Sequence, residues 1–61
     1  MNNFKIGDVV YLKSGSDAMT ITYIEKNNHY KVTWIDKSGK PHYGSYPKEA
    51  LTKENPMTLN I

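Results

Sequence analysis

Apolar and polar residues alternate in four short runs along the chain, and turn-forming residues separate these runs. Alternation with a period of two, rich in β-branched and aromatic residues, is typical of half-buried β-strands. The predicted strands are Asp8–Lys13, Met19–Glu25, His29–Asp36 and Lys40–Tyr46. The fourth run is the weakest, because it contains Pro41 and Gly44. No segment of ten residues shows the 3.6-residue apolar period of an amphipathic helix, so the pattern predicts an all-β protein.

The residues between the runs favour tight connections. Asparagine tolerates a positive φ angle, so Lys26–His29 predicts a tight hairpin in which Lys26 pairs with His29. Asp36–Lys40 predicts a three-residue loop with Gly39 in the left-handed conformation. Pro47–Ala50 predicts a single 3₁₀ or helical turn, and Leu51–Thr52 a short last strand. Strands at this spacing suggest a small barrel or sandwich, and their order resembles a five-stranded SH3-like barrel.

The two hairpins also predict which residues share a face of the sheet. The expected cross-strand pairs are Ile21 with Trp34, Tyr23 with Val32, Trp34 with His42 and Val32 with Gly44. The candidate core residues are Ile6, Val10, Leu12, Met19, Ile21, Val32, Trp34, Tyr46 and Leu51, and Tyr23 and Tyr30 lie on the same face. A slip of one residue in either hairpin would turn that strand over.

Length and composition limit the function classes. The chain has 61 residues and a net charge of +2, with no cysteine and no arginine among its basic residues. We expect one domain at residues 1–53 and a tail at residues 54–61. The lack of cysteine excludes disulfides and thiolate metal sites. With no apolar leader and no run of about 20 apolar residues, we expect a cytoplasmic protein without a membrane partner.

Several of these residues together resemble one family. The residues are Lys5–Gly15, Met19–Ile21, Trp34, Tyr46–Pro47 and Ala50–Leu51. They are similar to the YodC-like family of small uncharacterised bacterial proteins, across roughly residues 5 to 52. The chain departs from the family pattern at Ser16-Asp17, where Gly-Pro is usual, and in its tail past Lys53. The resemblance implies the small barrel fold and no catalytic residues.

The candidate chemical groups do not form a convincing catalytic or metal site. His29 and His42 fall at opposite ends of the predicted hairpin, too far apart to share an ion, and no other ligand set has metal-like spacing. A Ser-His-Asp triad needs a recessed nucleophile, and a barrel this small has its interior filled by side chains. We therefore expect no enzyme activity, no metal and no cofactor.

A partner-binding role is the leading expectation. Apolar and tyrosine side chains on the outer parity of the strands are either scattered surface residues or a docking face for a protein or peptide. The candidate contact residues are Val9, Tyr11, Ile24, Lys31, Thr33, Ile35 and Tyr43. An exposed strand edge is a second docking route. Trp34 is either a core residue or a stacking platform.

Two alternatives stay open. Lysines beside tyrosines are typical of a weak nucleic-acid-binding module, although acidic residues lie among Lys13, Lys31, Lys37 and Lys40. In the tail, Met57–Ile61 alternates apolar and polar residues. This segment is either disordered or an added edge strand, which covers the open edge of its own barrel or pairs with a neighbouring chain to give a homodimer.

Overall fold

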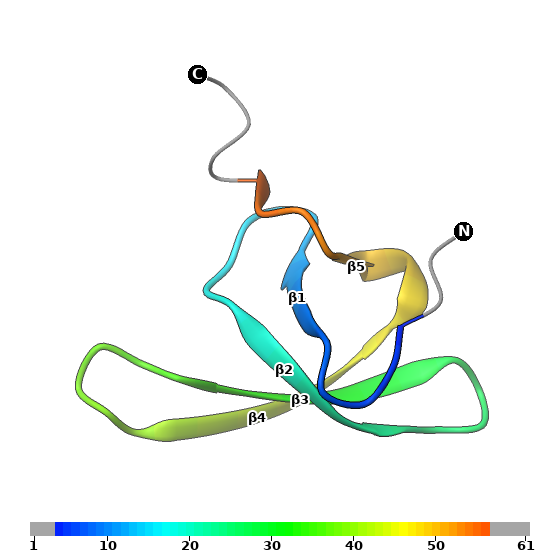
Figure 1. Ribbon diagram of the computed structural model, residues 1–61, viewed down its shortest axis with the longest axis horizontal. Helices are drawn as coiled ribbons and strands as arrows, with labels where there is room; N and C mark the ends of the chain where they lie inside the picture. Colours follow the sequence, from blue (N-terminus) through cyan, green and yellow to red (C-terminus); the bar gives the residue numbers. More distant parts are fainter. Residues whose placement is uncertain (1–3, 57–61) are drawn as a thin grey trace.

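The computed structural model describes residues 4–56, which form one antiparallel five-stranded sheet (Figure 1). The strands are β1 (Val9–Leu12), β2 (Met19–Ile24), β3 (His29–Ile35), β4 (Pro41–Pro47) and β5 (Leu51–Thr52), with a 3₁₀ turn η1 (Lys48–Ala50) before β5. Their order in the sheet is β4-β3-β2-β1-β5. The all-β prediction is confirmed, with one 3₁₀ turn in the expected place. The edge strands β4 and β5 do not pair with each other, so the sheet is not closed into a barrel.

The hairpin between β3 and β4 has the predicted register. The Asp36 amide donates to the Lys40 carbonyl at 3.0 Å, and the Gly39 amide donates to the Asp36 carbonyl at 3.0 Å. Gly39 has a φ angle of 86°, the left-handed conformation that closes a three-residue loop. The expected pairs of Trp34 with His42 and of Val32 with Gly44 are both present.

The hairpin between β2 and β3 differs from the prediction by one residue. The Glu25 amide, not that of Lys26, meets the His29 carbonyl, at 2.8 Å. Lys26 therefore joins the loop, and Asn28 takes the left-handed position with a φ angle of 64°. This is the same three-residue loop type as at Gly39, rather than the tighter hairpin expected from the two asparagines.

A β-bulge in β2 then decides which side chains reach the core. Tyr23 pairs with Lys31, but Ile21 pairs with Val32, so Thr22 is an extra residue on the β2 side. The prediction that Tyr23 lies in the core and opposite Val32 is wrong, because the longer loop turns this end of β2 over. The bulge turns the strand back, so Ile21 is buried as predicted, although its partner is Val32 rather than Trp34.

The same shift moves Ile24, which was expected on the outer face. Ile24 pairs with the buried Tyr30, and residues paired across a ladder share a face of the sheet. Ile24 therefore belongs to the core side, at the open end of the hairpin, where it is only partly covered. Ile24 is therefore not one of the outer contact residues.

The core lies between the β2–β3–β4 meander and the β1–β5 pair, which stands on one side of it in Figure 1. Its buried members are Phe4, Val10, Met19, Ile21, Tyr30, Val32 and Leu51. Of the predicted core residues, Leu12, Trp34 and Tyr46 are only partly buried and pack against this cluster.

Ile6 is the predicted core residue that the structure contradicts, since 63% of it is exposed. The Asp8 amide donates to the Lys5 carbonyl at 3.0 Å, and Gly7 has a φ angle of 95°, which is the geometry of a type II turn. Ile6 occupies the corner of this turn and points to solvent. Phe4 fills the core instead, with its ring edge-on to Tyr30 at 5.4 Å between centroids.

Candidate functional site

One face of the β2–β3–β4 meander carries large uncovered side chains. We call it the outer face; it comprises Val9, Thr20, Tyr23, Lys31, Thr33, Ile35, Tyr43 and Ser45. Cross-strand pairing aligns these residues in rows, one of which runs from Val9 through Thr20 and Thr33 to Tyr43. Exposure is 77% for Tyr43, 60% for Ile35, 56% for Tyr23 and 49% for Val9. The face thus combines aromatic and branched aliphatic surface on three adjacent strands and the start of β1.

Charge on the outer face is locally balanced. The Lys31 ammonium lies 3.8 Å from a Glu25 carboxylate oxygen and 5.7 Å from the centre of the Tyr23 ring. The Ser45 hydroxyl donates to the same Glu25 carboxylate at 3.4 Å. These contacts tie β2, β3 and β4 together across the face. The cation of Lys31 is already matched by an anion, so the middle of the face offers little net charge to a partner.

A shallow hollow interrupts this face, and we call it the outer hollow. It is lined by Thr22, Lys31, Val32, Tyr43, Gly44 and Ser45. The Val32 side chain is buried in the core and Gly44 has no side chain, so their backbone forms the floor. The core side of Gly44 also favours glycine. A Cβ atom at this position would lie 3.0 Å from the Tyr46 ring and 3.3 Å from the Trp34 ring.

Trp34 lies on the core side, where polar groups hold it in place. The His42 ring stacks on the indole at 5.6 Å between centroids, and His42 Nε2 lies 2.8 Å from Asp36 Oδ2. This hydrogen bond to His42 is the main reason why the pKa of Asp36 is well below its ordinary value, and the Lys40 amide lowers it further. The indole is part of the packed hairpin, which agrees with the core interpretation more than with a free stacking platform.

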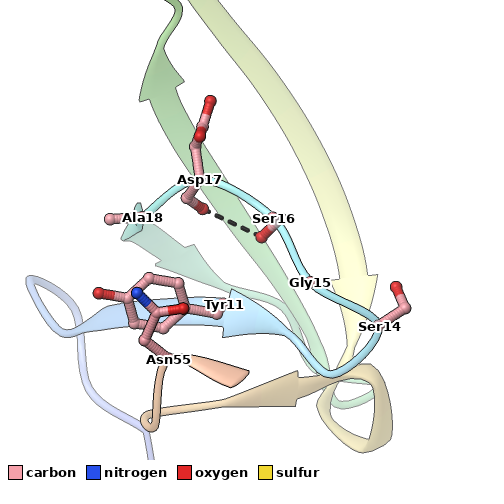
Figure 2. Close-up of a pocket in the computed structure, with 7 residues that line it drawn as sticks. All are labelled: Tyr11, Ser14, Gly15, Ser16, Asp17, Ala18 and Asn55. Carbon is pink, nitrogen blue, oxygen red and sulfur yellow. Dashed lines mark hydrogen bonds between the residues drawn. The ribbon is translucent and has the colours of Figure 1, made fainter. Parts of the chain in front are cut away.

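Tyr11 faces a different part of the surface from the other candidate contact residues. Figure 2 shows it below the 14–18 loop and beside Asn55, in a hollow that these residues line together. The loop is fixed by its own hydrogen bonds: Gly15 donates to the Leu12 carbonyl at 2.9 Å, and the Leu12 amide donates to the Ser16 hydroxyl at 3.0 Å. The structure therefore divides the predicted contact set, with Tyr11 apart from the outer face.

The arrangement of serine, histidine and aspartate at the β3–β4 loop is not that of a catalytic triad. Asp36 lies between the other two: Ser38 Oγ donates to Asp36 Oδ1 at 2.7 Å, while His42 contacts Oδ2. A triad requires the histidine between the acid and the hydroxyl. Asp36 thus acts as the cap of its own loop, accepting also from the Ser38 and Lys40 amides, each at 2.9 Å.

His29 and His42 lie at opposite ends of the β3–β4 hairpin, since His29 pairs with Pro47 and His42 with Trp34. Within residues 4–56, no group of three histidine or acidic side chains is placed to hold a metal ion. No helix in this part of the chain has the length and apolarity to cross a membrane.

Comparison with known proteins places the chain in a family by its sequence. A family model described as an uncharacterised small protein family, DUF2158, matches residues 5–51. The chain belongs to this family. The matched region runs from the turn before β1 to the first residue of β5, so it includes all of the outer face. Neither the curated proteins nor the solved structures gave a match.

Sequence reasoning missed four side chains of the outer face and its hollow, which are Thr20, Thr22, Tyr23 and Ser45. Thr22, Tyr23 and Ser45 all contact or flank Lys31 on the outer face, as the hydrogen bond from Thr22 Oγ1 to the Lys31 carbonyl at 3.3 Å shows for the first of them. Thr22 and Tyr23 both oppose Lys31 because of the bulge. The predicted contact residues that the structure does bring together on this face are Val9, Lys31, Thr33, Ile35 and Tyr43.

Proposed function

We propose that the protein is a small non-catalytic binding module that docks a protein or peptide on its outer face. The observation that carries the proposal is the exposure of Tyr43, Ile35 and Tyr23 on one side of three paired strands. Exposed aromatic residues gathered on one face are typical of docking surfaces, because they add large contact area with few rotatable bonds.

The fold that supports this role is, in our proposal, of the SH3-like barrel type, left open between the edge strands β4 and β5. A three-stranded meander followed by η1 and by β5, which returns to pair with β1, has the strand order of such a barrel. The YodC-like character and bacterial origin suggested by the sequence are part of the same proposal. A cytoplasmic location is supported by the absence of cysteine from the sequence.

A nucleic acid is the alternative partner, and the charge pattern favours it less. The lysine on the outer face is Lys31, and Glu25 offsets its charge at 3.8 Å. A phosphate backbone approaching Lys31 would also meet this carboxylate. An apolar protein or peptide surface meets no such penalty, and the tyrosines supply its contact area.

The test is affinity capture from the native cell extract with a tagged full chain. We expect capture of a defined protein partner that resists nuclease treatment and raised salt, since phosphate-mediated binding weakens steeply with salt. The double variant Tyr23→Ser/Tyr43→Ser should lose the partner. Ile6→Ser is the matched control, because it removes a similarly exposed apolar side chain that lies in the turn before β1 rather than on a strand of the outer face.

Retention of the partner by the double variant, or its loss from Ile6→Ser alone, would contradict the assignment of the site. Loss of binding upon nuclease treatment would instead support the nucleic-acid alternative. In that case, Lys13→Gln, Lys31→Gln and Lys40→Gln combined should abolish binding, whereas docking through the apolar face should survive this change.

A further inference from the structure

The β4 strand is a free edge of the sheet, and its backbone polar groups alternate in direction. Lys40 and Lys48 both make hydrogen bonds toward β3, since the Asp36 amide donates to the Lys40 carbonyl and the Lys48 amide donates to the Asn28 carbonyl, each at 3.0 Å. In an antiparallel ladder, such paired positions recur at every second residue. The even-numbered residues of β4 therefore face β3, and the odd-numbered residues direct their amide and carbonyl groups away from the sheet.

This alternation leaves a short and symmetric set of free groups. The outward positions of β4 are Pro41, Tyr43, Ser45 and Pro47, and the prolines carry no N–H. The outward donors are thus the amides of Tyr43 and Ser45, one on each side of Gly44. The prolines lie three positions before and after the same glycine. No strand among residues 4–56 pairs with this edge.

The geometry points to a second copy of this chain as the occupant of the β4 edge. Two β4 strands placed antiparallel about a twofold axis at Gly44 set Tyr43 opposite the partner's Ser45. Each such pair exchanges two N–H···O=C bonds, so the two pairs satisfy all four outward amides with four outward carbonyls. Each proline then lies opposite a proline of the partner, where neither strand has an N–H to leave unpaired.

The same arrangement gives the outer hollow an occupant. A twofold axis perpendicular to the sheet keeps both outer faces on one side, so the partner's Tyr43 lies beside Ser45. Ser45 pairs with Lys31, and both line the hollow. Among residues 4–56, Tyr43 is the most exposed large apolar side chain, at 77%, and in the dimer it extends over the Ser45–Lys31 row of its partner.

The pattern fits a second copy more closely than an unrelated peptide. Binding of an unrelated strand does not require a proline at each end of the site. In a pair of β4 strands, the two prolines end the intermolecular hydrogen bonding in both directions. Beyond the prolines, the register would place Lys40 opposite the partner's Lys48, and like charges oppose further pairing. The interface is short, so it predicts a weak dimer below the size of standard stable interfaces. This inference rests on the β4 edge and does not require the proposed docking function, although both use Tyr43 and the outer hollow.

The experiment is sedimentation of the full chain at increasing concentration, with two variants at one position. Ser45→Pro removes an outward amide that bonds to no other strand, while Ser45→Ala keeps that amide and removes only the hydroxyl. We expect a monomer–dimer equilibrium for the natural chain and for Ser45→Ala, and a monomer for Ser45→Pro with an unchanged circular dichroism spectrum. A natural chain that stays monomeric at millimolar concentration, or equal dimerisation of Ser45→Pro and Ser45→Ala, would overturn the inference.

A cross-linking measurement covers the case in which Ser45→Pro does not fold. The natural chain has no cysteine, so Tyr43→Cys and Ser45→Cys each introduce a single thiol. Hydrogen-bonded partners in an antiparallel ladder have Cα atoms about 5.5 Å apart, within the range of a disulfide. Oxidation of the mixed variants should give the heterodimer in preference to either homodimer. A statistical mixture, or failure to cross-link, would refute the register, whereas a failed capture experiment would leave it unaffected.

Discussion

Phe4 and Ile6 are large apolar side chains in the same short segment before β1, and the structure places them in opposite environments. Phe4 is 5% exposed and packs edge-on against Tyr30, whereas Ile6 is 63% exposed at the corner of a turn. The perturbation we consider is truncation of each to alanine. From the apolar pattern alone, truncation of Ile6 is expected to destabilise the fold more, because Ile6 adjoins the first strand. The structure predicts the reverse order.

The expected magnitudes differ by several kcal/mol. Truncation of a buried phenylalanine costs about 3–5 kcal/mol, as transfer and cavity terms combine. Phe4 lies before β1 and outside the strands of the sheet, so we expect a cost at the lower end of this range, about 3 kcal/mol. The edge-on contact with Tyr30 accounts for about 0.5–1.5 kcal/mol of it. Truncation of Ile6 should change the free energy of unfolding by less than about 0.5 kcal/mol. For a domain of this size, 3 kcal/mol corresponds to a fall in Tm of roughly 12–24 °C.

The assay is thermal and urea unfolding of the natural chain, Phe4→Ala and Ile6→Ala, followed by circular dichroism and by Trp34 fluorescence. The urea dependence of the unfolding free energy should stay the same in Ile6→Ala, and Phe4→Leu should restore part of the loss in Phe4→Ala. If Ile6→Ala were as destabilising as Phe4→Ala, the placement of the segment before β1 would be wrong.

Three further predictions rest on local geometry. Gly44→Ala should destabilise the fold by about 1–3 kcal/mol and shift Trp34 fluorescence, because the new methyl group meets the ring at 3.3 Å; an unshifted spectrum would contradict the contact. Asn28→Ala should lower stability by about 1 kcal/mol in urea unfolding and Asn28→Gly should not, because the φ angle there is 64°. The Asp36 pKa is lowered, chiefly by the hydrogen bond to His42, so this carboxylate stabilises the fold fully above about pH 4 and the contribution is lost as the pH falls toward the lowered pKa. Asp36→Asn should therefore flatten the acid side of the stability–pH curve, and an unchanged acid limb would count against the cause we assign.

The strand positions could be predicted from the sequence because the apolar alternation is local. All five strands and η1 lie within a residue or two of their expected limits, and the β3–β4 register follows from Gly39. The β2–β3 register was wrong because two asparagines suggest a two-residue loop. A signal for the correct loop was present: Glu25 to His29 repeats the pattern of Asp36 to Lys40, an acid followed three residues later by the left-handed residue.

The errors at Tyr23 and Ile24 follow from that one register. The longer loop turned Tyr23 outward and Ile24 inward, and the bulge at Thr22 confined the exchange to that end of β2. A bulge depends on packing against the neighbouring strands, which no local pattern in β2 records. The outer residues of β3 and β4 were predicted correctly, since their register did not depend on it. The exposure of Ile6 and burial of Phe4 depended on the turn at Gly7, which alternation does not describe.

Because of the two-residue strand β5, we expect the domain to fold and unfold in a single cooperative transition. Leu51 is fully buried, yet the strand that holds it is joined to the sheet by pairing with β1, about forty positions earlier in the chain. A strand this short has no stability of its own, and the core is open until Leu51 enters it. We expect the amides of β1 and β5 to exchange with solvent only through global opening, at the same free energy as those at the centre of the meander. The β5 strand is in this sense the last piece of the core rather than a fraying margin.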